Sequence, residues 1–445
     1  MADLMQLAEA AVAAALAAGA EWCDAVCANS RVIGVDIEKS SLRECETARE
    51  LGLGVRAFSR GGCGLASLLH PDLAGAQECG RQAAEMARAT HGDPNFVALP
   101  PPAPVPAAAG LFDPQIAALS ADQAVRWCRE GLEEAREVSA EAVLSGGVDF
   151  AWSEKALASS TGIRVATRGS SISIAFNAIV RRGDDVGVYW EWDAARRLED
   201  FEPRGVARTA TETALRFLGA KPVRTAPLPV ILGPEAADGF LGRLISAANA
   251  ESIQRQRSFL VGKQGESIAS PHLTLREEPL LPAGLSSTAT DGEGVPKQPL
   301  TLIDAGVLTT YLHNSYTAGK AGIASTGHAA RGGYSGDVGI GLSNLVPQLG
   351  TQTAAEMIAE VDEGLYICES SLSTDSITGD VSATVDYGFK IEKGELTHPV
   401  EATMIGGNIL ELTARLDAIS SDYRAEPGRI LPTVRLSRVQ VSSGG

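Results

Sequence analysis

The sequence predicts an α+β protein, with N-terminal α/β sandwich-like units followed by a C-terminal β-rich domain built as a curved antiparallel sheet or barrel. The 47 glycines and 22 prolines among 445 residues imply many turns, as expected for a chain rich in strands. A Pro-rich stretch at 98–110 and several hairpins beyond residue 223 divide the chain. The clearest strand, "SISIAFNAIV", has an apolar residue at every second position: Ile172, Ile174, Phe176, Ala178 and Val180.

Residues 1–99 are predicted to form an N-terminal α+β domain. Its first segment is Ala-rich but has no basic start, and Asp3 and Glu9 interrupt it, so we expect an amphipathic helix rather than a signal peptide. Extended runs between Asp24 and Phe58 predict strands. A second helix is expected to begin at Asp72.

Residues 100–222 are predicted to form a central α+β domain that follows an extended Pro-rich linker or strap. Ser120 and Gln123 have the spacing of a capping box, which predicts the start of a helix. The strand around Phe176 is expected to turn at Gly183-Asp184 and return. A helix from about residue 204 to 218 ends the domain.

Residues 223–445 are predicted to form the C-terminal β-rich domain. A buried strand ends at Leu232, and Gly233-Pro234 then predicts a helix start. The segments "LIDAGVLTTYL" and "YGFKIEKGELTHPV" predict hairpins, the second with a Lys393-Gly394 turn. A short helix, "NILELTARL", and a last strand, "PTVRLSRVQV", complete the pattern.

The charge of the chain excludes some classes of partner. With 38 basic and 55 acidic residues the net charge is −17, which repels nucleic acid and anionic membranes. No uninterrupted apolar run reaches the length of about 18 residues that suggests a membrane span. Seven cysteines without a Cys-x-x-Cys pair predict reduced thiols in a cytoplasmic protein.

Motifs for autonomous catalysis are absent from the sequence: no phosphate-binding loop, EF-hand loop, Gly-x-Ser-x-Gly elbow or His-Glu-x-x-His pair occurs. Two features leave alternatives open. His328 in "STGHAARGG" is either a catalytic base or a loop histidine that donates one hydrogen bond. The acidic segment Asp291-Gly292-Glu293-Gly294 is either a cation site or a glycine-shaped turn whose carboxylates accept backbone N–H bonds.

Three segments of the C-terminal domain resemble the TldD/PmbA family, and specifically its PmbA (TldE) branch. They are "SSTATDGEGVPKQPLTLIDAGVLTTYL", "ASTGHAARGG" and "DSITGDVSATVDYGFKIEKGELTHPVEATMIGGNILEL", in that order. The N-terminal "LGLGVRAFSRGGCGLAS" also fits, so the resemblance covers nearly the whole chain. It implies a pair of subunits that enclose a cleft for unfolded or small peptides. In such a pair the TldD type binds zinc through a His-Glu-x-x-x-His helix and a late Cys.

The segment that matches the zinc helix carries no zinc ligands. The family's positions fall at Leu241, Gly242 and Ser246, and residues 238–248 contain no His, Cys or Glu. No Cys occurs in 419–445 either. A catalytic zinc needs about three protein ligands, so we expect no metal and no cofactor in this chain. An apolar stripe occupies the helix instead: Phe240, Leu241, Leu244, Ile245 and Ala248.

The resemblance implies that Asp291, Glu293, His328, Arg331 and Asn408 belong to the substrate cleft. His328 departs from the family, which usually has Asn after "STG". Because His can also acquire a charge near neutral pH, this exchange would adjust the substrate if the loop lines the cleft.

The expected function is that of a non-metal-binding PmbA/TldE-type subunit in a heteromeric TldD/TldE zinc metallopeptidase. It would supply half of the cleft for unfolded or small peptides, modified ones included, while the TldD-type partner holds the zinc. One alternative is a stand-alone homodimeric tailoring enzyme for a peptide-like natural product, with His328, Asp291 and Glu293 as acid–base candidates. The other is a non-enzymatic scaffold that binds peptides.

Overall fold

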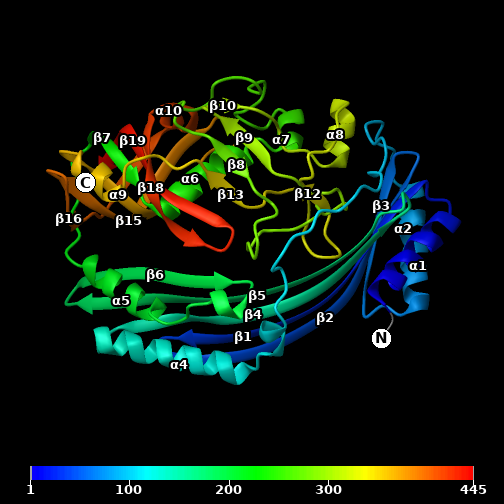
Figure 1. Ribbon diagram of the computed structural model, residues 1–445, viewed down its shortest axis with the longest axis horizontal. Coiled ribbons are helices and arrows are strands. Elements are labelled where there is room, and N and C mark those ends of the chain that lie inside the picture. The colour runs from blue at the N-terminus through cyan, green and yellow to red at the C-terminus, as the bar shows by residue number, and fades with distance from the viewer. Residues whose placement is uncertain (1–2, 444–445) are drawn as a thin grey trace.

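A six-stranded antiparallel sheet in the order β3-β2-β1-β4-β5-β6 forms the N-terminal part of the computed structural model (Figure 1). The structure describes residues 3–443; residues 1–2 and 444–445, at the ends of the first and last predicted domains, lie outside this range. The strands are long, and the sheet bends along its length (Figure 1). They are β1 (Trp22–Glu38), β2 (Ser41–Ser59), β3 (Gly62–Leu69), β4 (Val143–Ser159), β5 (Arg164–Arg182) and β6 (Asp185–Ala195).

This sheet crosses the boundary that the sequence places between residues 99 and 100. Strand β1 pairs with β2 of the first predicted domain and, on its other side, with β4 of the second. The Pro-rich segment between them contains no helix or strand from residue 91 to residue 113. It is the extended linker or strap that the sequence predicts. The hydroxyl of Thr161 holds it against the sheet by donating a hydrogen bond to the Pro100 carbonyl at 2.7 Å.

Helices cover one face of the sheet, because the strands alternate between apolar and polar residues. The odd-numbered residues of β1, such as Cys23, Ala25, Ile33 and Val35, are buried under these helices. The even-numbered Asp24 lies on the other face, toward the C-terminal domain. The helices of the N-terminal part are α1 (Leu4–Ala17), α2 (Leu73–Ala89), α3 (Pro114–Ala118), α4 (Ala121–Val138), the 3-10 turn η1 (Leu198–Asp200) and α5 (Val206–Arg216).

The predicted capping box at the start of α4 is wrong. Ser120 is the N-cap residue, but its side chain makes no capping hydrogen bond. Gln123 does not reach back to the N-cap, because its side-chain oxygen accepts a hydrogen bond from Arg126 one turn later. A complete capping box occurs instead at the start of α9, between Thr353 and Glu356.

The C-terminal domain contains a closed, barrel-like sheet, as predicted. Strands β14, β7, β19, β17 and β15 pair in that order, and pairing of β14 with β15 closes the ring, with β16 and β18 as additions. Closure leaves the ring without free edges. The strands are β7 (Ala226–Leu232), β14 (Glu363–Ser370), β15 (Asp380–Glu392), β16 (Glu395–Pro399), β17 (Thr403–Asn408), β18 (Leu416–Glu426) and β19 (Arg429–Ser443).

Two smaller sheets, of orders β10-β9-β8-β13 and β11-β12, lie beside the barrel, on the same side of the N-terminal sheet (Figure 1). Their strands are β8 (Leu275–Glu277), β9 (Leu300–Asp304), β10 (Val307–Leu308), β11 (Ala329–Arg331), β12 (Val338–Ile340) and β13 (Leu345–Pro347). The helices of this domain are α6 (Pro234–Ser246), α7 (Ala250–Gln254), α8 (Ser315–Ala321), α9 (Ala354–Ala359) and α10 (Ile409–Ala414). No helix among residues 3–443 is long and apolar enough to cross a membrane.

The predicted hairpins and turns are present. Lys393 and Gly394 connect β15 to β16, both with positive φ (52° and 79°), as a type I′ turn requires. Helix α6 begins at Pro234 after the N-cap Gly233, and its apolar stripe from Phe240 to Ile245 is buried in the largest core of the molecule, as is Ala248 just beyond the end of the helix. This stripe holds α6 against the barrel.

A cluster of charges joins β6 of the N-terminal sheet to α6 and the β18–β19 hairpin. Arg424 on β18 donates to Glu191 Oε1 at 2.7 Å and to the Trp192 carbonyl at 3.1 Å, both on β6. Its Nε lies 2.9 Å from Glu426 Oε1 and 3.6 Å from Glu235 Oε1. The Arg424 guanidinium therefore interacts with three carboxylates that come from three different elements.

Acidic groups outnumber basic ones at this junction. Arg429 on β19 lies 3.0 Å from Glu426 Oε2 and also pairs with Asp238 of α6, while Glu369 on β14 accepts a hydrogen bond from Trp190. Burial and the nearby Glu235 carboxylate raise the pKa of Glu426 to about 7. Between about pH 4.5 and pH 7 the folded chain therefore holds a proton that the unfolded chain has lost, so stability falls as the pH rises through this range.

We predict that Glu426→Gln raises the melting temperature at pH 8 and changes it little at pH 5, because the amide reproduces the neutral form of the side chain. Thermal unfolding at the two pH values measures the effect. Glu411→Gln, at a carboxylate with a 67 % exposed side chain, is the control. A variant that is less stable at pH 8 than the unmodified chain contradicts the assignment.

Candidate functional site

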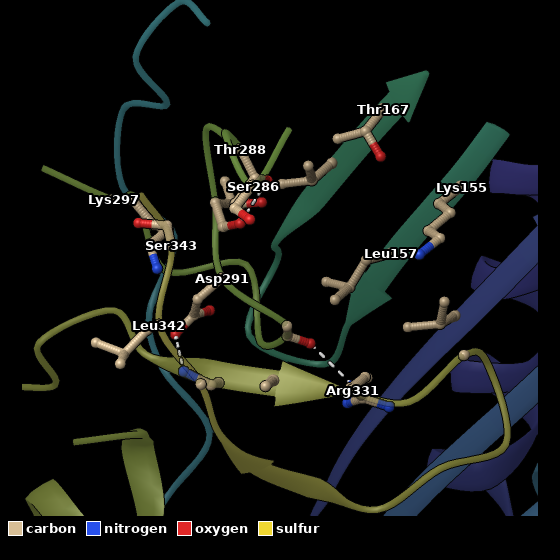
Figure 2. A pocket seen from close by; sticks show the side chains of 18 residues that line it. Lys155, Leu157, Thr167, Ser286, Thr288, Asp291, Lys297, Arg331, Leu342 and Ser343 are labelled. Carbon is tan, nitrogen blue, oxygen red and sulfur yellow. Dashed lines mark hydrogen bonds between the residues drawn. The ribbon is translucent and has the colours of Figure 1, made fainter. Parts of the chain in front are cut away.

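A cavity of about 320 Å³ opens between the N-terminal sheet and the C-terminal domain (Figure 2). The sheet supplies Lys155 and Leu157 from β4 and Thr167 from β5. The C-terminal domain supplies two segments, 286–297 and 329–343, and the second of them contains β11 and β12. The cavity is therefore lined by parts of the chain that are far apart in sequence and are brought together where the N-terminal sheet packs against the C-terminal domain.

The acidic segment 291–294, before the β9–β10 hairpin, forms the glycine-shaped turn that is one of the two alternatives given by the sequence. Asp291 Oδ1 accepts hydrogen bonds from the backbone N–H groups of Glu293 and Val295, each at 2.9 Å, and Oδ2 accepts one from Ala329 at 3.0 Å. Gly294 has a φ of 83°, which glycine adopts without strain. Asp291 thus ties the turn to β11, and it lines the cavity.

The environment of Asp291 makes its ionisation costly. Burial, and then the charge of Glu293, raise its pKa to about 6 although three backbone N–H groups stabilise the carboxylate. Asp291 is therefore ionised near neutral pH but takes up a proton in mildly acidic solution. This titration would alter the wall of the cavity.

Glu293 does not line the cavity; it belongs to a buried network of ion pairs between the two domains. Arg56 Nη2 on β2 lies 2.6 Å from Asp24 Oδ2 on β1 and 2.8 Å from Glu293 Oε1. Arg331 Nη2 lies 2.5 Å from Asp24 Oδ1, and Arg331 Nε donates to the Gly292 carbonyl at 2.8 Å. All four side chains are less than one-tenth exposed.

The electrostatics of the network favour its charged state. Burial alone would raise the pKa of Asp24, but Arg331 and Arg56 hold it below its ordinary value. The pKa of Arg56 is raised, because the attraction of Asp24 and Glu293 outweighs the burial that would lower it. The charges of the two carboxylates and the two guanidiniums cancel. Their ion pairs attach the cavity wall, formed by residues 291–293 and Arg331, to the N-terminal sheet.

His328 lies behind the cavity wall rather than in it. Its side chain is 1 % exposed; Nε2 lies 2.5 Å from Glu277 Oε2 and Nδ1 lies 2.8 Å from Thr326 Oγ1. Burial alone would raise the pKa of Glu277, but the hydrogen bond and charge of His328, together with Lys297, lower it to about 2. Both ring nitrogens of His328 take part in hydrogen bonds that hold the loop before β11 in place. The side chain therefore presents no free nitrogen to a substrate.

Tyr334, just after β11, is seated on two glycines of β2. A Cβ atom built on Gly54 would lie 1.7 Å from the Tyr334 carbonyl oxygen, and one on Gly52 would lie 2.2 Å from the Tyr334 ring. Any other residue at these positions would displace the loop. The motif "LGLG" in β2 is thus the sequence signal of a contact with a segment about 280 residues later.

The remaining predicted site residues lie elsewhere. Asn408 caps α10, accepting from Leu410 N at 3.1 Å and donating to the Thr378 carbonyl at 2.8 Å, and it is not part of the cavity. On α6, Leu241 is buried, Gly242 carries no side chain, and the Ser246 hydroxyl donates to the Arg243 carbonyl.

These three positions on α6 offer no donor set for zinc. Among residues 3–443, no group of three or more His, Cys, Asp or Glu side chains is placed to hold a metal ion. The residues present do not fit the zinc that the resemblance associates with this helix.

Sequence reasoning missed four residues that shape the site: Asp24, Arg56, Glu277 and Lys297. Their positions follow from long-range packing. A charged residue at an alternating position of a strand, such as Arg56, has the pattern of an ordinary solvent-exposed side chain.

Comparison with known proteins accounts for this architecture. Three family models match consecutive parts of the chain: PmbA/TldA metallopeptidase domain 1 at 23–87, the central domain at 114–218 and the C-terminal domain at 225–443. The chain belongs to the TldD/PmbA family. It is 28% identical over 336 residues to the metalloprotease PmbA of Escherichia coli O157:H7, covering 75% of this chain and 72% of that protein.

Two further members extend the likeness to nearly the whole length. A metalloprotease of Methanothermobacter thermautotrophicus is 27% identical over 419 residues, covering 91% of this chain and 89% of that protein. The crystal structure of TldE from Thermococcus kodakarensis superposes with a TM-score of 0.90 at 25% identity, covering 98% of this chain and 100% of that one. The TldD/PmbA fold described above is therefore shared from end to end.

We predict that Arg56→Met lowers the free energy of unfolding by about 3–5 kcal/mol, because it leaves the buried carboxylates of Asp24 and Glu293 without their shared partner. Urea denaturation measures this change. Arg81→Met is the control: Arg81 pairs with Glu78 on an exposed surface, where water screens the pair and its removal should change the stability little. Equal losses in the two variants would show that the buried network does not join the domains.

We also predict that Gly54→Ala destabilises the protein by about 1–3 kcal/mol, because the added methyl group overlaps the Tyr334 backbone. Gly339→Ala on β12 is the matched control, since a Cβ there meets no atom within 4 Å. Denaturation curves of the two variants are compared. If they coincide, the Tyr334 loop is not held against β2.

Proposed function

We propose that this chain is the non-metal-binding subunit of a heteromeric TldD/TldE zinc metallopeptidase, in which it supplies half of the cleft for unfolded or small peptides. The observation that carries the proposal is α6. By the resemblance to the family, Leu241, Gly242 and Ser246 of this helix stand where a zinc helix would carry ligands, and none of the three is a His, Cys or Glu. Hydrolysis of a peptide by zinc needs about three protein ligands and an activated water.

The state of His328 supports an accessory role over independent catalysis. A general base must reach the proton that it removes, either directly or through one water. His328 is buried, and Glu277 and Thr326 occupy its two ring nitrogens. The cavity beside it combines apolar, hydroxyl and charged groups, which suits binding of a peptide. In the proposed complex the zinc and its general base belong to the TldD-type partner.

Co-expression with a TldD-type protein carrying an intact His-Glu-x-x-x-His helix tests this proposal. We expect the two chains to copurify with one zinc per pair and to cleave an unfolded peptide. Substitution of the partner's zinc-binding histidines should abolish cleavage, whereas His328→Ala in this chain should leave zinc content unchanged. This chain alone should hold no stoichiometric zinc by metal analysis and should cleave nothing. One tightly held zinc per copy of the isolated chain, together with peptidase activity, would overturn the proposal.

A further inference from the structure

Lys297 is a buried cation on the cavity wall that uses little of its hydrogen-bonding capacity. Its side chain is 6 % exposed, and Nζ lies 3.4 Å from Glu277 Oε1. That distance is longer than the 2.7–2.9 Å typical of a charge-assisted hydrogen bond. The same oxygen already accepts the N–H and the hydroxyl of Ser343, each at 2.5 Å. An ammonium has three donors, so Lys297 retains donors for a ligand in the cavity.

Lys155 is a second cation, on the opposite side of the cavity (Figure 2). It is exposed, and within the described residues it forms no ion pair; the adjacent Glu154 pairs with Arg168. Asp291 is the one carboxylate among the lining residues, and its oxygens already accept three backbone N–H groups. Arg331 is neutralised by Asp24. The two lysines are therefore the groups left to attract a ligand, and they attract an anion.

The rest of the lining indicates what kind of anion fits. Val26, Leu157, Val165 and Leu342 form an apolar surface, and the hydroxyl-bearing residues Ser286, Thr167 and Thr290 also line the cavity. A volume of about 320 Å³ is at the small end of the range for ligand sites, about 300–1,000 Å³. This volume suits the end of a peptide better than its middle. An apolar residue that ends in a carboxylate matches the lining in charge, polarity and size.

We propose that this cavity binds the free C-terminal carboxylate of a short peptide between Lys297 and Lys155, with the terminal side chain against the apolar wall. The inference deepens the proposed function and rests on it for the peptide; the preference for a carboxylate follows from the two lysines. Such a contact would select peptides by their free end and would set the direction in which they enter the cleft.

Binding of three acetylated, fluorescently labelled tripeptides to the full chain tests this inference. The first ends in leucine with a free carboxylate, the second is its C-terminal carboxamide, and the third is a carboxamide with an internal glutamate. We expect the carboxamide to bind at least roughly tenfold more weakly than the free acid in fluorescence anisotropy, which matches the loss of a hydrogen bond to a charged group. Equal binding of acid and amide, or no binding of either, overturns the inference. Tight binding of the third peptide shows that any carboxylate suffices, and it overturns the assignment to the C-terminus.

Variants distinguish direct contacts of the two lysines with the peptide from a general effect of the charge of the protein. Lys155→Met, at an exposed position, should fold normally and remove most of the preference for the acid. Lys297→Met should do the same, and thermal unfolding checks that its fold persists. Lys263→Met, at an exposed lysine outside the cavity, should change nothing. A complex that forms with the TldD-type partner and holds zinc, but binds acid and amide equally, overturns only the carboxylate inference and leaves the proposed function standing.

Discussion

The buried network of Asp24, Arg56, Glu293 and Arg331 is the constraint on which the arrangement of the two domains depends. Four charges removed from water stabilise a structure only when every charge has its partners, because desolvation of each ion costs several kcal/mol. Here each carboxylate has a guanidinium at 2.5–2.8 Å, and the charges balance. The network forms only when the N-terminal sheet and the 291–331 region meet in one register, so it specifies a single relative placement of the domains.

The placement of the cavity follows from this register. Arg331 and Gly292 hold the acidic turn, Asp291 ties the turn to β11, and Tyr334 sits on the glycines of β2. Behind this wall the Glu277–His328 pair fastens the next loop. The wall is therefore preorganised by buried contacts, while the lysines that face the cavity keep free donors. A selective binding site needs polar groups that are held rigidly and still have free donors. Rigid support helps because fewer side chains then lose conformational entropy when the ligand binds.

The sequence predicted the parts of this structure that depend on local pattern, and it failed where distant segments meet. Period-two strands, the Lys393-Gly394 turn and the apolar stripe of α6 are local, and all are present. The capping box at Ser120 failed because Gln123 had a competing partner, Arg126, one turn away. Arg56 and Lys297 have no local signature of their roles, since their partners lie up to 237 residues away. Among these long-range contacts, that of Tyr334 with Gly52 and Gly54 is the one with a signal in the sequence. Glycine within a strand indicates that another part of the backbone approaches closely.

The packing of α6 is the physical basis of the proposal that this helix holds no zinc. Leu241, Leu244 and Ile245 are 0–3 % exposed in the largest core of the molecule. A zinc helix must turn polar ligands toward a water-accessible site, whereas this helix turns an apolar face into the barrel. Replacing a buried leucine by a smaller or polar residue costs about 2–5 kcal/mol, so restoring ligands at Leu241 would cost stability as well as require new partners. The apolar contacts that anchor α6 to the barrel thus keep Leu241 in the core, and this packing supports the proposal that hydrolysis belongs to a second subunit.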